Sequence, residues 1–465
     1  MKNNLKNKNI LVYGLGKSGI ASYELLKTVK ANVTTYDDKR FPNKVLDLEN
    51  SNFDLAVVSP GISQNSELYQ KLLRKNIKII SEIELAHLFL KGKKIAITGT
   101  NGKTTTITLL GHIFKSCANR FKRKNIFVVG NVGMPLSSIA LKTNRNSLSL
   151  IELSSFQLEK TEKFNADIVS ILNIAPDHLD RYKNVNEYIL AKERIFENQN
   201  SNQIAVLNYN DKYFNRFLSK CKGKAYYFSL NDESQNEQFK GIFKHEDRLF
   251  FKEKNIEYLL SVKDVKLIGN KNLENILAAV LISKMEGLNM KKVENAINNF
   301  MPLENRLEII KEDKNAIFIN DSKATNIASA VADIKAIDGE KIVLLGGSDK
   351  GEDFSTLAKQ LKANKQIVKF IVYGATSKKI STAFNNFKIK NYEVMENFES
   401  AVKLSKELAS NSKSKIVVLL APACASFDEF ENYIERGKAF KKLIILDNQK
   451  EGWWKRKRQN FRLKS

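Results

Sequence analysis

Long apolar runs are missing from this sequence of 465 residues. No uninterrupted apolar stretch approaches the roughly 18 to 20 residues that a membrane-spanning helix requires. The first residues, MKNNLKNKNILVYG, also lack the apolar core of a secretory signal before the first expected strand. These absences argue against a transmembrane segment and predict a cytoplasmic protein.

Cysteine is scarce, with only Cys117, Cys221 and Cys424 in the whole chain. Their spacing matches neither a CxxC motif nor a metal-binding pattern. A disulfide framework is therefore excluded, which fits a reducing compartment. We expect the first two thiols to be buried packing groups.

Acidic residues are outnumbered, 51 against 76 basic ones, which gives a net charge of +25. Such a balance suits nucleic acid, an anionic surface or small anionic substrates. The excess is spread along the chain as Lys among many Asn, so we expect no nucleic-acid binding. The exception is the basic tail, residues 449–465, where two Trp precede six basic residues. Either a disordered, loosely docked end or a weak contact with an anionic surface would explain it.

A phosphate-binding loop is predicted by the stretch KIAITGTNGKTTTITLL, residues 94–110, within a chain long enough for two to four domains. It reads as strand, glycine turn and helix. Gly99 and Gly102 would let the backbone approach a polyphosphate, Lys103 adds a charge, and the Thr104 hydroxyl can bind Mg²⁺. Ile97 stands where the first glycine of the full P-loop motif belongs, so a plain glycine turn with a surface lysine is the alternative.

A second glycine motif, Gly14-Leu15-Gly16-Lys17-Ser18-Gly19, follows an expected strand at residues 9–13 and opens a helix at 20–29. An acidic pair, Asp37 and Asp38, comes after the next strand, which is the context of a diphosphate-binding turn. A nicotinamide cofactor is the familiar ligand, but any nucleotide diphosphate fits. The third strand, 54–58, ends in Ser59-Pro60-Gly61, either a ligand loop or an ordinary turn.

Ionisable residues collect where later strands end. Glu152 lies in the apolar strand expected at 147–153, where an unpaired acid costs several kcal/mol, so we expect a metal or a basic partner, or else a structural salt bridge. The apolar run 168–174 leads into Asp177 and His178, for which we favour a metal or phosphate role over an ordinary histidine. Lys192, on the helix expected at 185–198, is by periodicity a solvated lysine.

The remaining polar groups occupy a helix and three loops. Asn272 and Asn275 are one helical turn apart and could face one ligand, with helix capping as the competing use. The loops at 320–326, 346–351 and 422–428 each follow an apolar strand, which predicts a second doubly wound domain. Each loop alone could be a plain turn. Together they predict an anion site with four donors: Lys323, Thr325, Lys350 and Ser426.

Over nearly its whole length the chain resembles the Mur ligase family. The resemblance rests on the stretches GLGKSG, SPGI, GTNGKTTT, ELSSFQLE, APDHLDRY, AKERIFEN, NDSKATN, LLGGSDKGEDF and PACASFDEF. It implies an α/β fold of three domains. These are a Rossmann-like domain for the UDP-substrate at 1–91, a P-loop ATPase-like central domain at 92–300 and a Rossmann-like amino-acid domain at 301–448, which closes over its substrate; the tail follows.

The resemblance also implies an activity. The ELSSFQLE and PACASFDEF stretches look like the family's D-glutamate-adding member. The expected enzyme is an ATP-dependent amide ligase that joins D-glutamate to UDP-N-acetylmuramoyl-L-alanine through an acyl phosphate in peptidoglycan synthesis. It would use two Mg²⁺ ions and act as a monomer. Lys192 matches the lysine that relatives carboxylate with CO₂, a reaction that needs a neutral amine with a lowered pKa.

The resemblance assigns roles residue by residue. The expected catalytic residues are Lys103, His178, Lys192 and Lys323, and the metal ligands are Thr104, Glu152, His178 and Lys192 as its carbamate. The expected ATP contacts are Gly99, Thr100, Asn101, Gly102, Lys103, Thr104, Thr105, Asn272, Asn275, Arg306 and Asp321. The UDP-substrate would meet Gly14, Leu15, Gly16, Ser18, Asp37, Lys39, Ser59, Pro60, Gly61, Asn131, Gln157 and His178. D-Glutamate would meet Thr325, Lys350, Ser426 and Tyr433.

Two residues depart from the family pattern. Asn305 replaces the histidine usual before Arg306, and Tyr433 stands where Phe is common. Rival functions also stay open: a nicotinamide oxidoreductase would leave the ATP loop unused, and a regulatory P-loop NTPase would leave the third domain unexplained. Another Mur ligase or a folylpolyglutamate synthetase would differ only in substrate.

Overall fold

The computed structural model describes residues 5–40, 46, 51–117, 125–178 and 181–445. Within these ranges the chain forms three parallel-rich sheets, which confirms the expected α/β class. It divides into two compact units. The first contains residues 1–175, 184–265 and 272–300, and the second contains 176–183, 266–271 and the chain from 301 onward. The basic tail, 449–465, lies outside the described residues.

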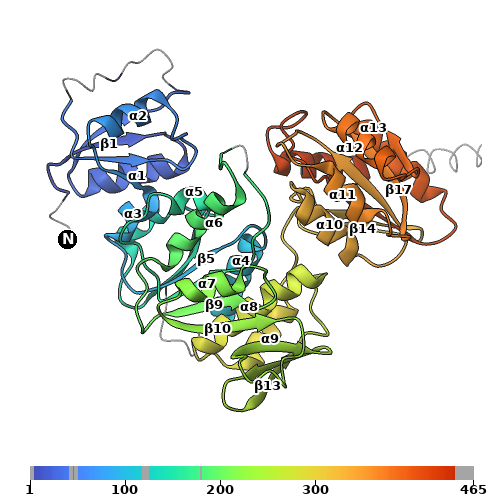
Figure 1. Cartoon of the computed structure of the whole chain (residues 1–465), viewed down its shortest axis with the longest axis horizontal. Coiled ribbons are helices and arrows are strands. Elements are labelled where there is room, and N and C mark those ends of the chain that lie inside the picture. Colours follow the sequence, from blue (N-terminus) through green and yellow to red (C-terminus); the bar gives the residue numbers. More distant parts are fainter. Residues whose placement is uncertain (1–4, 41–45, 47–50, 118–124, 179–180, 446–465) are drawn as a thin grey trace, which may run out of the picture. The chain divides into compact units, whose positions relative to one another are not determined.

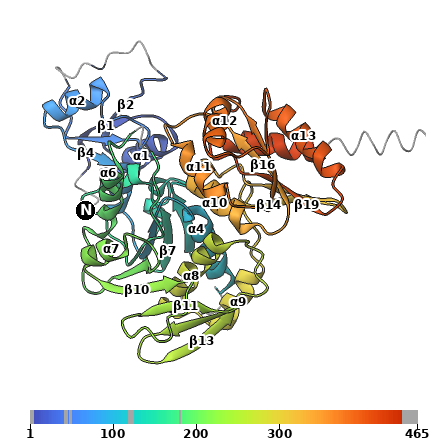
Figure 2. The same ribbon diagram turned by 45° about the vertical axis from the view of Figure 1, so that its right-hand side comes forward.

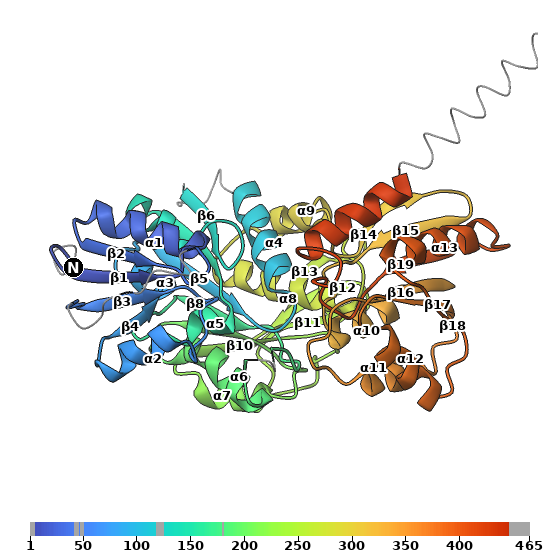
Figure 3. The same ribbon diagram turned by 90° about the horizontal axis from the view of Figure 1, so that it is seen from above.

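The first sheet has four parallel strands in the order β2-β1-β3-β4. Its strands are β1 (Asn9–Tyr13), β2 (Asn32–Tyr36), β3 (Leu55–Val58) and β4 (Ile79–Ser81). Helices α1 (Lys17–Thr28) and α2 (Glu67–Arg74) lie on opposite faces (Figure 3), and α3 (Glu82–His87) follows β4. Because β1 is covered on both faces, its residues from Ile10 onward are buried.

The second sheet, also in the first unit, has nine strands in the order β13-β12-β11-β10-β9-β8-β5-β7-β6. The strands from β6 to β11 pair in parallel, and β12 and β13 add an antiparallel edge, seen low in Figure 2. Their bounds are β5 (Lys93–Thr98), β6 (Asn125–Gly130), β7 (Ser147–Glu152), β8 (Ile168–Ile171), β9 (Ile204–Asn208), β10 (Lys224–Ser229), β11 (Gly241–His245), β12 (Arg248–Lys252) and β13 (Ile256–Ser261).

Helices cover both faces of this second sheet (Figure 3). On one face lie α4 (Lys103–Ser116), α8 (Asn270–Met285) and α9 (Met290–Asn298); on the other lie α5 (Ser155–Leu158), α6 (Val185–Glu193) and α7 (Phe214–Lys220). Short 3₁₀ turns are η3 (Leu136–Ser138), η4 (Ala140–Lys142) and η5 (Arg194–Phe196). Because helices cover both faces of the sheet, every residue of β7 and the last four residues of β5 are buried.

The third sheet belongs to the second unit, coloured orange to red in Figure 1, and has six strands in the order β14-β15-β19-β16-β17-β18 (Figure 3). Only β14 runs antiparallel. Its elements are β14 (Glu308–Glu312), β15 (Ala316–Asn320), α10 (Ile327–Ala336), β16 (Lys341–Gly346), α11 (Phe354–Leu361), β17 (Ile367–Tyr373), α12 (Ser377–Asn386), β18 (Tyr392–Val394), α13 (Phe398–Ser410) and β19 (Ile416–Leu420). One apolar layer packs α10, α11 and α12 on the sheet, and another packs α13 and the helical residues 433–445.

Some element ends differ from the sequence expectation. The strand expected at 168–174 stops at Ile171, and the helix expected at 185–198 continues past Glu193 as the tighter η5. All three cysteines are free thiols, with Cys117 and Cys424 buried and Cys221 partly exposed. None of the helices in the described part of the chain combines the length and apolarity needed to cross a bilayer.

Candidate functional site

The predicted ATP loop joins β5 to α4. Gly99 has a φ of +146° and Gly102 a φ of +83°, conformations that favour glycine. A Cβ atom on Gly102 would lie 2.1 Å from Asn275 Oδ1, so a side chain of α8 presses against the loop. Asn275 Nδ2 donates to Asn272 Oδ1 at 3.3 Å. Both Asn residues lie inside α8, which begins at Asn270, so the capping alternative is wrong for them.

Asn173 braces this loop, a role that sequence reasoning missed. Its side-chain oxygen accepts from Asn101 N at 2.9 Å, and its amide nitrogen donates to Asn101 O at 3.1 Å. Its own carbonyl accepts from Thr100 N at 2.9 Å. These bonds explain why the strand ends so early, since Asn173 bonds to the loop and not to a neighbouring strand. An asparagine in an otherwise apolar run was the available signal.

Lys103 lies across the loop. Its ammonium donates to the carbonyl oxygens of Gly99 and Thr100, each at 2.8 Å. The bonds hold a positive charge against the glycine turn, where backbone N–H groups at the start of α4 also attract anions. The arrangement suits a polyphosphate, and Thr104 is the second residue of α4.

Lys192 is buried, with 1% of its surface exposed, so the solvated-lysine interpretation is wrong. Its ammonium donates to Gly99 O at 2.9 Å, contacts Thr98 Oγ1 at 3.4 Å, and lies 4.6 Å from the centre of the Tyr188 ring. Tyr188 OH in turn contacts Thr100 Oγ1 at 3.1 Å. Helix α6 thus carries Lys192 directly to the phosphate loop, which periodicity alone did not predict.

Glu152 ends strand β7, opposite Ile97 at the end of β5, so it lies beside the start of the loop. Its side chain is 1% exposed. Oε1 accepts from Asn131 Nδ2 at 2.8 Å, while Oε2 has no hydrogen-bond partner among the described residues. An unsatisfied buried carboxylate oxygen is costly unless a cation or donor reaches it.

The side chains beside the phosphate loop suit Mg²⁺ better than a metal ion whose ligands all come from the protein. Within the described ranges, no group of three or more His, Cys, Asp or Glu side chains is arranged to hold a metal ion. Magnesium is commonly bound by one or two carboxylates together with water and substrate phosphates. Glu152, with its unsatisfied oxygen, and the Thr104 hydroxyl match that pattern.

His178 has a strained backbone, with a φ of +55°. Its N–H donates to Asp177 Oδ1 at 2.9 Å, and its ring Nε2 lies 3.8 Å from Asp177 Oδ2. Residues 176–183 belong to the second compact unit, whereas Thr104, Glu152 and Lys192 belong to the first. That His178 joins them stays a prediction.

The diphosphate turn uses its three glycines differently. Gly14 has a φ of +90°, and a Cβ on Gly19 would lie 1.8 Å from Gly14 O, so both are needed for packing. A Cβ on Gly16 would meet no atom within 4 Å, which leaves the turn's middle glycine open to a ligand. Ser59 Oγ donates to Gly14 O at 2.7 Å and so joins the third strand's loop to the turn.

Two predicted substrate contacts are also structural. Asp37 accepts from Leu15 N at 2.5 Å and from the N–H groups of Lys39 and Arg40 at 3.0 Å. Burial would raise the pKa of Asp37, but these backbone donors outweigh it and lower the pKa. Gln157 is buried, and its side-chain oxygen accepts from Ser154 N at 3.0 Å in a capping box. Their contacts with a substrate stay predictions.

In the second unit, Arg436 ties the three predicted strand-end loops together, another role that sequence reasoning missed. It is fully buried. Its guanidinium donates to Ser322 Oγ at 3.0 Å, and to the carbonyl oxygens of Ser322, Gly346, Cys424 and Ala425 at 2.9–3.4 Å. Because the sheet order is β15-β19-β16, the loops after these strands are neighbours. No local motif marked this arginine.

Three of the four predicted D-glutamate residues lie on these loops, and the fourth, Tyr433, begins the helical residues 433–445. Ser426 is buried, while Thr325 and Lys350 are half-buried. The Lys323 ammonium lies 4.0 Å from the centre of the Tyr433 ring, close enough for a cation–π interaction. Ser322 Oγ donates to Tyr433 O at 2.8 Å, and this bond holds the backbone of Tyr433 in place. A Tyr in place of Phe therefore keeps an aromatic face for the lysine.

Asn305, one of the two residues that depart from the family pattern, has a structural role in this chain. It is buried with a φ of +61°, a left-handed conformation that Asn tolerates better than most residues. Its side-chain oxygen accepts from Asn320 Nδ2 at 2.9 Å, and its carbonyl accepts from Lys323 N at 3.1 Å. The residue thus supports the backbone of the predicted catalytic lysine.

Asp321, a predicted ATP contact, is buried. Burial and then the neighbouring Asp333 carboxyl raise the pKa of Asp321 well above its usual range, against the opposing charge of Arg306. The pair is most stable with at least one proton between the two carboxyl groups. Asp333, on α10, is a further residue that sequence reasoning missed.

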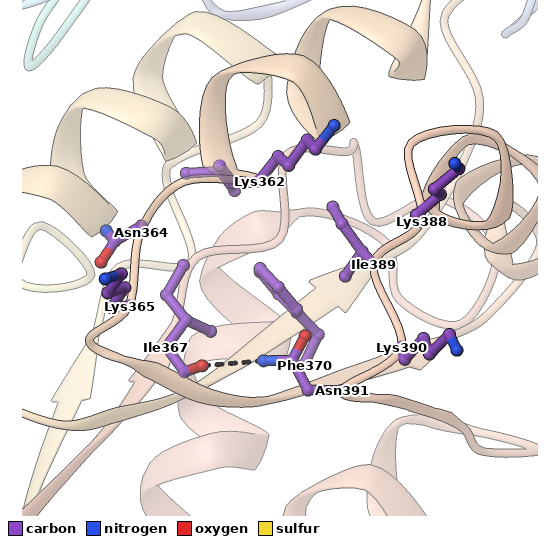
Figure 4. A pocket seen from close by; sticks show the side chains of 10 residues that line it. Lys362, Asn364, Lys365, Ile367, Phe370, Lys388, Ile389, Lys390 and Asn391 are labelled. Carbon is purple, nitrogen blue, oxygen red and sulfur yellow. Dashed lines mark hydrogen bonds between the residues drawn. The ribbon is translucent and has the colours of Figure 1, made fainter.

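A hollow of about 290 Å³ lies elsewhere in the second unit (Figure 4). Its lining includes Ile367 at the start of β17 and Lys362, which caps the end of α11. None of the predicted site residues lines it. Lysines are favoured at the ends of helices because they offset the helix dipole. That role explains Lys362, and Lys388 just after α12, without a ligand.

The sequence of the chain matches known proteins of one family. Residues 97–283 match the Mur ligase middle domain, and residues 305–424 match the Mur ligase, glutamate ligase domain. The chain is 36% identical to the UDP-N-acetylmuramoylalanine--D-glutamate ligase of Caldanaerobacter subterraneus subsp. tengcongensis, with 95% of this chain and 99% of that protein covered. It is 37% identical to the enzyme of the same name from Koribacter versatilis, with 95% and 98% covered.

Solved structures give the same fold. The UDP-N-acetylmuramate-alanine ligase MurC of Thermotoga maritima superposes with a TM-score of 0.58 at 18% identity, covering 96% of this chain and all of that one. MurF of Acinetobacter baumannii superposes with a TM-score of 0.60 at 13% identity, covering 95% of this chain and 92% of that one. At such identities these neighbours establish the fold alone.

Proposed function

The chain belongs to the Mur ligase family, and from this premise we propose that it is the ligase that joins D-glutamate to UDP-N-acetylmuramoyl-L-alanine in peptidoglycan synthesis. The observation that carries the proposal is the likeness, at 36–37% identity over 95% of the chain, to enzymes named for that reaction. The braced phosphate loop supplies the matching ATP chemistry. A nicotinamide oxidoreductase would leave that loop unused.

The chemical task is to make an amide from a carboxylate, which is a poor electrophile. A carboxylate oxygen of the substrate attacks the γ-phosphorus of ATP, which gives an acyl phosphate and releases ADP. The D-glutamate amine then attacks the carbonyl carbon, and phosphate leaves as the amide forms. Two anions must approach each other in the first step, so fixed positive charge near the phosphate lowers the barrier most.

The chain supplies that charge from two lysines. Lys103 is held over the glycine turn by two backbone carbonyls, so its charge is in place before ATP arrives. Lys323 is positioned by the Tyr433 ring and by the bond from its backbone N–H to Asn305. When bound, Mg²⁺ screens the repulsion between the phosphates and the substrate carboxylate. Glu152 and Thr104 would hold it, and we propose two such ions with His178 as a further ligand.

We further propose that Lys192 carries a carbamate formed with CO₂. Burial beside the loop carbonyl of Gly99 supports this, because a carbamate there would be a metal-binding carboxylate shielded from water. Lys192→Ala should abolish most activity, with partial rescue by acetate or formate. Labelled bicarbonate should give a carbamate NMR signal that the variant lacks. Lys220→Ala, at an exposed residue of α7, is the matched control, and an unchanged Lys192→Ala enzyme would contradict the assignment.

The function is tested by phosphate release with ATP, Mg²⁺ and UDP-N-acetylmuramoyl-L-alanine. D-Glutamate, L-glutamate, L-lysine and meso-diaminopimelate are added separately. We expect release with D-glutamate alone. Preference for another amino acid would assign a different family member, and release that needs no amino acid would indicate a plain ATPase. A cytoplasmic location and a monomeric state complete the proposal.

A further inference from the structure

One acidic side chain within the D-glutamate loops has no role in the proposed chemistry. Glu352 lies between β16 and α11, two residues after Lys350, and is half-buried. Its Oε2 accepts from the N–H of Ile327 at 3.2 Å. Ile327 is the first residue of α10, directly after the cap Asn326, whose side chain accepts from Ser329 N. Glu352 therefore connects the loop after β16 to the helix that follows the loop of Thr325.

The charged and titratable groups around Glu352 come from each neighbouring segment. Lys350 and Asp349 belong to its own loop, and Asp177 belongs to residues 176–183 of the same compact unit. The charge of Glu352 also helps to raise the pKa of the Cys424 thiol, which lies on the loop after β19. Asp349 is itself paired with Lys379 on α12. Glu352 thus lies where the three loops meet.

This surrounding makes Glu352 sensitive to pH in the neutral range. Burial, and then the like charge of Asp177 and Asp349, raises the pKa of Glu352 to about 7, although the Ile327 N–H and Lys350 oppose the rise. The side chain is then neutral at pH 6 and ionised at pH 9. The change occurs while D-glutamate keeps both of its carboxylates ionised.

The two states of Glu352 act differently on a diacid. The ionised carboxylate offsets part of the Lys350 charge and repels each incoming carboxylate. The neutral acid leaves the full lysine charge available. Either state can keep the bond from Ile327, so the loop itself need not change.

We propose that Glu352 sets the affinity of the D-glutamate site, and that its ionised form weakens binding of this diacid. This inference rests on the proposed function, because it takes the loops of Thr325, Lys350 and Ser426 as the D-glutamate site. It assigns to Glu352 an electrostatic role through Lys350 and α10, without a contact to the reacting atoms.

The test compares KM for D-glutamate between pH 6 and 9 in the wild type, Glu352→Gln and Glu393→Gln. Gln keeps an acceptor for the Ile327 N–H but cannot ionise. We expect wild-type KM to rise roughly tenfold over this range, the effect of one nearby like charge, while the Gln variant keeps a low KM. KM for ATP should follow one profile in all three. Glu393, on β18, carries an equal charge and pairs with Lys369 on β17, so Glu393→Gln should follow the wild type.

Each other outcome overturns the inference in a distinguishable way. Parallel KM profiles in wild type and Glu352→Gln would remove the electrostatic role. A KM raised equally at every pH in Glu352→Gln would make the residue a structural cap alone. If the folded wild type released no phosphate in response to D-glutamate at any pH, the proposed function itself would fail. Thermal unfolding of each variant confirms that the fold is retained.

Discussion

The conformation of the phosphate loop depends on residues that cannot be substituted without strain, and Gly102 is the clearest example. Its φ is +83°, and a Cβ would lie 2.1 Å from Asn275 Oδ1. Gly102→Ala must therefore adopt a left-handed conformation, at roughly 1–2 kcal/mol, and also displace Asn275. We expect KM for ATP to rise at least tenfold, or turnover to fall by that factor, with the fold retained.

The matched control is Gly287→Ala. Gly287 has a φ of +71°, but a Cβ there would meet no atom within 4 Å. It introduces the same backbone strain away from the loop, so its stability should fall while KM for ATP stays unchanged. Equal ATP kinetics for both variants would show that Asn275 does not support the nucleotide loop.

At this scale the sequence predicted residues that belong to local motifs and missed those that act from a distance. The glycines and Lys103 follow from a short pattern, because strand, turn and helix are contiguous. Asn173 and Arg436 do not, because each contacts backbone atoms far along the chain. Lys192 falls between these two cases. Helical periodicity predicted a solvent-exposed side chain, and only the family resemblance predicted a role at the site.

At the scale of elements, α3 connects the two sheets of the first unit. Glu84 accepts from the N–H groups of residues 162, 163 and 164 at 2.9–3.0 Å. Glu82 accepts from Ser137 N, at the centre of η3, at 2.5 Å. Helix α3 follows β4 of the first sheet, so these two acids anchor the first sheet to segments of the second.

This connection should depend on pH through Glu82. Burial raises the pKa of Glu82 to about 7, against an ordinary value near 4.5 in the unfolded chain. The folded state therefore holds the proton more tightly, and stability falls as pH rises from about 4.5 to 7. Glu82→Gln stays neutral, so it should be more stable than the wild type at pH 8, by at most about 3 kcal/mol.

Denaturant unfolding at pH 4.5 and pH 8 measures this difference. The advantage of Glu82→Gln should be small at the lower pH and largest at the higher one. Glu24→Gln, an exposed change on α1, should show no such trend. An advantage of the same size at both values would mean that Glu82 does not titrate in this range.

Element type was predictable where the apolar pattern was continuous, and element ends were not. The alternation of strands and helices in all three sheets follows from apolar runs separated by polar loops. The early end of β8 does not follow, because Asn173 bonds to the ATP loop and not to a neighbouring strand. A tertiary demand on the backbone there overrides local propensity.

At the scale of the whole molecule, the fold class was predictable from the sequence and the strand order was not. Three nucleotide-fold modules follow from the glycine motif, the ATP loop and the three later strand-end loops. The order β13-β12-β11-β10-β9-β8-β5-β7-β6 depends on long crossover connections that no local pattern encodes. The predicted domain boundaries at residues 91 and 300 stay predictions.

The central claim is that the chain activates a carboxylate as an acyl phosphate before an amine attacks it. UDP-N-acetylmuramoyl-L-alanine labelled with ¹⁸O in its terminal carboxylate tests this most directly. Mass spectrometry of the phosphate released during turnover with ATP, Mg²⁺ and D-glutamate should find one labelled oxygen per amide formed, because that oxygen leaves with the phosphoryl group. Amide product accompanied by unlabelled phosphate would contradict the account.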